Sequence, residues 1–121
     1  MPKIADTAGR AAVTAVAAAH AAGSTPERTE LALACRWLLQ RLERESPGNS
    51  VEVRVPPFGA IQFVDGPRHT RGTPPNVVEM DAHTFVSLAT GTLAWATGVA
   101  EGGIRASGIR SDIGEFFPLA L

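Results

Sequence analysis

The segment that most constrains the fold is Val51–Val55, in which three valines alternate with a glutamate and an arginine. Apolar β-branched residues at every second position predict a strand with one face on a core and the other in solvent. The two prolines that follow end this strand, because proline has no amide proton to donate to a sheet. Residues 60–64 predict a second strand, and the Phe-Gly pair before them indicates a hairpin.

Two helices are expected before this strand. Residues 4–22 have alanine at more than half of their positions and are followed by Gly23, a residue that commonly ends helices. Residues 24–27, Ser-Thr-Pro-Glu, predict the start of a second helix through a Ser or Thr cap. Its apolar residues recur at helical spacing and predict one buried face. They are Leu31, Cys35, Leu38 and Leu42.

The second half of the chain predicts a loop followed by strands and helices. Residues 66–76 hold two glycines and three prolines without apolar periodicity, as expected of a loop. Residues 77–80 predict a short strand, and Asp81 predicts a helix cap for residues 82–90, which end at Gly91. A further helix is expected over residues 92–100 and a last strand over residues 104–107. The apolar tail beyond it should dock on the body or on a ligand.

Length and element order together predict one α+β domain. A chain of 121 residues has the usual size of a single domain. We therefore expect one domain over residues 1–121, with a helical part at 1–46 and a sheet with C-terminal helices at 51–121. Helices on both sides of a group of strands indicate a sheet with one face covered by helices.

Composition excludes several classes of function. The net charge of −1 gives no global field for nucleic acid, and no nucleic-acid partner is expected. A single cysteine allows no internal disulfide. The alanine-rich stretch is too short and too weakly apolar to span a bilayer, so no membrane span is expected and the cytoplasm is the default location.

No catalytic or metal site is expected. His20, His69 and His83 share no spacing typical of metal ligands and are interpreted as surface residues. Cys35 lies on the apolar helix face and is interpreted as an inert buried thiol. Asp112 and the nearby Glu115 are interpreted as solvated carboxylates on a helix. Because no nucleophile or nucleotide motif is present, we expect no catalytic residue, no cofactor and no enzymatic activity.

The basic loop is the clearest candidate site outside the core. Arg68, His69 and Arg71 can hold a phosphate or carboxylate, because guanidinium groups offer paired donors and nearby glycines let backbone amides approach an anion. In the alternative interpretation the loop is solvated and its arginines pair with acids such as Glu79 or Asp81. Both interpretations remain open on the sequence alone.

The closing half of the chain resembles sterol carrier protein domains. The shared pattern is a strand, an acidic cap, a helix, a glycine, a helix, a glycine, a strand, a glycine and an apolar tail. It is carried by Val78-Glu79-Met80-Asp81, Phe85, Leu88, Gly91, Trp95, Gly98 and Gly103-Ile104-Arg105-Ala106-Ser107-Gly108. With its arginine-containing loop, the sequence is similar to the short bacterial branch of that family, found in actinobacteria.

The resemblance implies a fold and a kind of ligand. It implies a mostly antiparallel sheet of about five strands, covered on one face by helices, with an apolar tunnel between the layers. Family members bind sterols, fatty acyl chains or acyl-CoA without a cofactor, so the expected partner is a lipid or another apolar small molecule. The expected tunnel walls are Phe58, Phe63, Phe85, Leu88, Trp95, Phe116 and Phe117.

A second function remains open at this point. The same aromatic residues also suit a solid core, since a domain of this size must bury several large side chains to be stable. The chain would then be an interaction or accessory module with a protein partner and no lipid.

Overall fold

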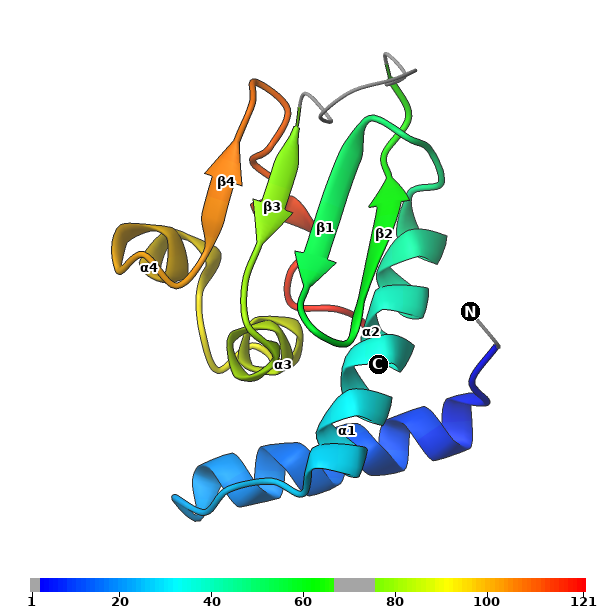
Figure 1. The fold of residues 1–121 in the computed structure, drawn as a ribbon, viewed down its shortest axis with the longest axis vertical. Coiled ribbons are helices and arrows are strands. Elements are labelled where there is room, and N and C mark those ends of the chain that lie inside the picture. The colour runs from blue at the N-terminus through cyan, green and yellow to red at the C-terminus, as the bar shows by residue number, and fades with distance from the viewer. Residues whose placement is uncertain (1–2, 67–75) are drawn as a thin grey trace.

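The structure is a computed structural model that describes residues 3–66 and 76–121 of the chain. Figure 1 shows the elements in their places. They are α1 (Asp6–Ala21), α2 (Arg28–Glu45), β1 (Val51–Val55), β2 (Gly59–Phe63), β3 (Val77–Glu79), α3 (Ala82–Thr90), α4 (Trp95–Ala100), β4 (Arg105–Ser107) and the 3₁₀ turn η1 (Gly114–Phe116).

The sheet in the described residues has four strands in the order β2-β1-β3-β4. Strands β1 and β2 form the expected antiparallel hairpin, with Val51 opposite Phe63. Strand β3 lies on the other side of β1 and runs parallel to it, and β4 pairs antiparallel to β3. The described residues therefore contain four strands where about five were expected, and one of their three pairings is parallel, so the sheet is mixed. The residues of a short strand do not indicate which other strand it will pair with, or in which direction.

In Figure 1, α2 runs along the β2 edge of the sheet and α1 crosses below the sheet. Helix α2 packs on β2 and on α3, while α1 packs on α2 and α3. The core lies between sheet and helices: Val51, Val53 and Val55 of β1 are buried there, as their alternation predicts. The expected α+β class is confirmed.

The opposite face of the sheet carries polar and charged side chains. Glu52 forms an ion pair with Arg54 on β1. Glu79 of β3 pairs with Arg105 of β4, with 2.9 Å between oxygen and nitrogen. Covering these charges with a further layer would require their desolvation, which is costly.

The boundary between α1 and α2 differs from the prediction. The N-cap of α2 is Glu27, without a side-chain capping bond. Ser24 instead closes α1: its amide donates to Ala19 O at 2.9 Å, and Gly23, with φ of 70°, donates to His20 O at 3.1 Å. This pair of bonds is a Schellman motif, which uses Ser24 at the end of one helix rather than at the start of the next.

The tail also differs locally from the prediction. Asp112 does not lie in a helix with Glu115; its side chain accepts a hydrogen bond from the amide of Gly114, which begins the short turn η1. Among the described helices, none is both long and apolar enough to span a bilayer.

Candidate functional site

The two phenylalanines of the tail connect the sheet to the helices. Phe116 meets Phe63 of β2 edge-on, with 5.1 Å between ring centroids. Phe117 meets Phe85 of α3 edge-on at 6.5 Å and stacks on Trp95 of α4 at 6.1 Å with parallel rings. Five of the seven expected wall residues are therefore brought together in one aromatic cluster. The tail itself supplies two of the five.

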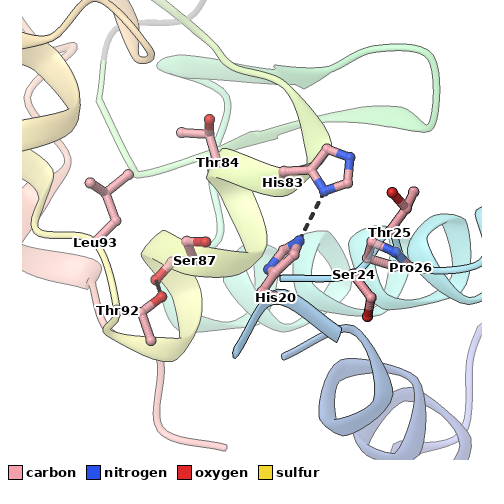
Figure 2. A pocket seen from close by; sticks show the side chains of 9 residues that line it. All are labelled: His20, Ser24, Thr25, Pro26, His83, Thr84, Ser87, Thr92 and Leu93. Carbon is pink, nitrogen blue, oxygen red and sulfur yellow. Dashed lines mark hydrogen bonds between the residues drawn. The ribbon is translucent and has the colours of Figure 1, made fainter. Parts of the chain in front are cut away.

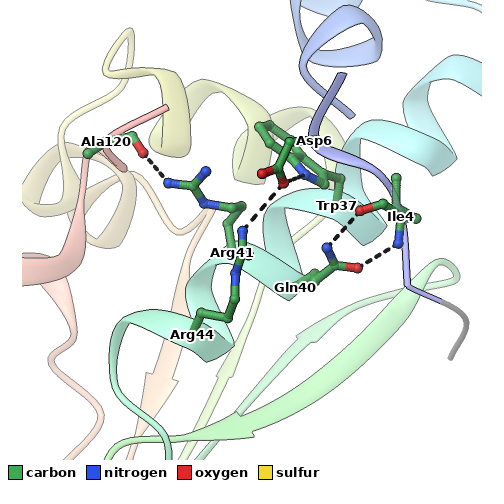
Figure 3. Close-up of polar contacts among 7 residues, drawn as sticks. All are labelled: Ile4, Asp6, Trp37, Gln40, Arg41, Arg44 and Ala120. Carbon is green, nitrogen blue, oxygen red and sulfur yellow. Dashed lines mark hydrogen bonds and ion pairs between the residues drawn. The ribbon is translucent and has the colours of Figure 1, made fainter. Parts of the chain in front are cut away.

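Backbone contacts fix the tail in this position. The amide of Leu119 donates to Ala89 O at the end of α3, at 3.0 Å. Arg41 of α2 donates to Ala120 O at 2.5 Å (Figure 3). The side chain of Leu119 is buried. The expectation that the tail docks on the body is confirmed.

The other two wall residues are placed differently. Leu88 is fully buried on α3. Phe58 lies in the turn between β1 and β2, where the Arg28 guanidinium sits over its ring at 5.2 Å. Arg36 donates to Phe58 O at 3.1 Å, which ties this turn to α2. Phe58 therefore lies against α2 and not in the aromatic cluster formed with the tail.

The described interior is occupied by side chains around these residues. Phe63, Phe85 and Leu88 have no exposed surface, whereas Trp95 and the two tail phenylalanines are partly exposed. Four surface hollows are lined by described residues, and none of these four includes any of the seven wall residues. None of these four hollows therefore provides a place for an apolar ligand beside the wall residues, and the phenylalanines of the tail are the partly exposed members of the aromatic cluster together with Trp95.

Arg68, His69 and Arg71 lie outside the described residues. The two acids that the sequence offered as partners for the loop both have other contacts. Glu79 pairs with Arg105, and the Asp81 side chain accepts a bond from the amide of Thr84 at 2.8 Å.

The largest of the four hollows lies between the α1–α2 connection and α3 (Figure 2). Its volume is about 540 Å³, and it is open to solvent on one side. His20 Nε2 of α1 and His83 Nδ1 of α3 lie 2.9 Å apart within it. Partial burial lowers the pKa of His20, and the neighbouring His83 lowers it further. The lining residues are His20, Ser24, Thr25, Pro26, His83, Thr84, Ser87, Thr92 and Leu93.

Sequence reasoning missed this histidine pair. The two residues are 63 positions apart, and neither has a local pattern that marks it. They meet only because α1 crosses α3, and this crossing is a tertiary contact. His83 is exposed and His20 is half-buried, as expected of surface residues, but their contact with each other was not predicted.

Polar contacts also hold the start of α1 on α2 (Figure 3). The indole nitrogen of Trp37 donates to Asp6 at 3.0 Å, and Arg44 lies 3.5 Å from the same carboxylate oxygen. This hydrogen bond, followed by the charge of Arg44, lowers the pKa of Asp6. Gln40 exchanges two hydrogen bonds with the backbone of Ile4.

Cys35 lies in surroundings that keep its thiol protonated. It is fully buried, and its Sγ lies 3.8 Å from Ala82 O. Burial, followed by the charge of Asp81, raises the pKa of the Cys35 thiol to about 12. The thiol is therefore protonated at neutral pH. In the described residues no group of three or more potential ligands is arranged to hold a metal ion.

The fold and the apolar layer define a class of protein: a small α+β domain with helices on one sheet face and an aromatic cluster between the layers. The family model described as a bacterial SCP ortholog, where SCP denotes sterol carrier protein, matches residues 27–119. The chain therefore belongs to this sterol-carrier-like family, and the resemblance in its closing half is confirmed. None of the curated proteins matches the chain.

Proposed function

We propose that this chain is a non-enzymatic carrier that holds a lipid, a fatty acyl chain or a sterol-like molecule. The family match over residues 27–119 carries the proposal, because lipid binding or carriage is the function that this family suggests. The matched range includes the whole sheet and the aromatic cluster. The chain acts as one domain over residues 1–121.

The apolar ligand lies between the sheet and the helices, against the seven wall residues proposed from the sequence. Two of these, Phe116 and Phe117, belong to a tail held by two hydrogen bonds to α2 and α3. Displacing this short segment exposes Phe63 and Phe85 without unfolding a helix or strand. Covering a ligand with apolar surface stabilises the complex by about 25 cal/mol for each Å² removed from water.

The basic loop holds an acidic head group in this proposal. Arg68, His69 and Arg71 supply the positive charge, since arginine pairs with carboxylates and phosphates through two parallel hydrogen bonds. A ligand with an acidic head group would then bind more tightly than a neutral sterol.

The two tryptophans allow a direct test, because they lie in different places. Trp95 stacks on the tail, whereas Trp37 is buried between α2 and α1. The substitution Trp37→Phe leaves Trp95 as the only tryptophan, and Trp95→Phe leaves Trp37 as the matched control. A fatty acid brominated in its chain quenches a tryptophan that it touches, and it should quench Trp95 but not Trp37.

Circular dichroism would check that both variants are folded. Equal quenching of the two tryptophans, or no quenching of either at saturating fatty acid, would contradict the proposed place of the ligand.

A protein-interaction or accessory module is the second candidate function. It is favoured by three exposed apolar side chains, Val99 at 41%, Ile109 at 100% and Leu121 at 43%. In this case a partner protein would be retained by the chain, retention would depend on Arg68 and Arg71, and no lipid would bind.

A further inference from the structure

The proposal concerns the histidine pair that joins α1 to α3. His20 comes from the last turn of α1, and His83 comes from the first turn of α3. Their ring centroids are 5.1 Å apart, with 52° between the ring planes. The rings are therefore not stacked, and each directs one nitrogen toward the other across 2.9 Å (Figure 2).

His20 Nε2 and His83 Nδ1 are joined by a hydrogen bond of 2.9 Å, so one of the two carries a proton that points toward the other. Nitrogen ligands lie about 2.0–2.1 Å from a divalent transition metal, so two ligands of one ion are about 2.9 Å apart at a right angle and about 3.3 Å apart in a tetrahedron. The two rings are therefore close enough for one ion to replace the shared proton after a small movement. The usual order of affinities at nitrogen sites favours Cu²⁺.

The protonation of the rings allows both nitrogens to act as ligands. Neutral imidazole carries its proton on either nitrogen, so both facing nitrogens can be free when each proton moves to the far side of its ring. Partial burial and His83 lower the pKa of His20, so this ring stays neutral to a lower pH than an ordinary histidine. Among the described residues, His83 is the only charged or titratable group that contributes to this shift.

The surrounding hollow leaves room for the other ligands of the ion. It is open to solvent, and Ser24, Thr25, Thr84 and Ser87 are among the residues that line it with the two rings. Water can complete the coordination.

We propose that His20 and His83 form a two-histidine site for a divalent transition metal, with Cu²⁺ and Ni²⁺ preferred over Zn²⁺. The bound ion fastens α1, which precedes the family match at residues 27–119, to α3, which lies within it. This site is independent of the proposed lipid carriage.

The test is titration of the full-length, untagged protein with CuCl₂, NiCl₂ or ZnCl₂, followed by calorimetry. His20→Gln and His83→Gln each remove one ring while retaining a polar group that can hydrogen-bond across the hollow. His69→Ala is the matched control, because His69 is the third histidine of the chain and lies outside this pair. We expect one Cu²⁺ per wild-type chain and an affinity order of Cu²⁺ above Ni²⁺ above Zn²⁺.

Each Gln variant should lose more than about tenfold in affinity, since even outer-shell partners of a metal cost about 10- to 100-fold when removed. His69→Ala should bind as the wild type does. Cu²⁺ paramagnetic resonance should show splitting from two ring nitrogens in the wild type and from one in each Gln variant. Binding should weaken as the pH falls and the rings become protonated.

Two results would overturn the proposal. One is equal Cu²⁺ affinity in the wild type and both Gln variants, and the other is a loss in His69→Ala as large as in the Gln variants. Melting curves of the metal-free variants show whether each is folded. Cu²⁺ should raise the melting temperature of the wild type and leave that of the Gln variants unchanged.

Discussion

Trp37 is fully buried although it lies near the outer surface of α2, because α1 covers it. Its indole nitrogen is satisfied by Asp6, and the guanidinium groups of Arg10 and Arg41 each lie 5.6 Å from its ring centroid. Gly9 of α1 faces this ring, and a Cβ atom there would lie 2.0 Å from Trp37 Cγ. The glycine is therefore required for the two helices to approach each other.

This contact leads to a prediction for Gly9→Ala. In an open helix this change stabilises by about 1 kcal/mol through helix propensity. Here the added methyl group overlaps the indole ring, and overpacking of this kind costs about 1–3 kcal/mol. We expect the free energy of unfolding, measured in urea, to fall.

Thr14→Ala is the control for this prediction, because Thr14 is exposed on the same helix. Its effect should stay within about 0.5 kcal/mol. If Gly9→Ala were as stable as Thr14→Ala, the packing of α1 on Trp37 would be wrong.

Contacts between helices, such as that of Gly9 with Trp37, cannot be predicted from the sequence alone. The alternation in β1 predicts which side chains are buried, because local geometry decides it. Nothing local distinguishes Gly9 among the alanines of α1, and nothing local pairs His20 with His83. Both features depend on how α1 crosses the other helices.

Among the elements, α3 is the one whose two ends were best predicted. Asp81 is its N-cap, and Gly91 ends it in the left-handed region with φ of 89°. The parallel pairing of β1 with β3 was not predicted, because two strands of three to five residues suit either direction. The start of α2 was placed too early because Ser24 matches a cap by residue type alone.

The contribution of the N-cap of α3 to stability can be tested by substitution. Asp81→Ala removes the acceptor for the Thr84 amide and should cost about 1 kcal/mol of stability. Asp81→Ser retains an oxygen in the same role and should cost less. Thermal unfolding followed by circular dichroism would measure both variants, and equal melting temperatures for the two would argue against a capping role.

At the scale of the whole molecule, the described residues form a four-stranded sheet on which α2 packs, with α1 packed on α2 and α3 (Figure 1). The family match covers residues 27–119, so it includes α2, the whole sheet and η1, whereas α1 precedes it. The class of fold and the family were predictable because glycine spacing and strand alternation are local patterns. A hollow and a filled interior use the same residue types, so the sequence does not separate them.

The described interior is filled in part by the chain's own tail, through Phe116 and Phe117. In the proposed function these tail side chains move aside when an apolar ligand enters and then cover it. The central claim is therefore that an apolar molecule binds between these tail side chains and Phe63 and Phe85.

The most direct measurement is mass spectrometry of the intact protein purified from the cells that make it, followed by organic extraction and analysis of the extract. The account predicts a complex with about one bound lipid or acyl chain per protein, and the same molecule in the extract. A spectrum that contains only the bare chain, together with an extract free of lipid, would contradict it.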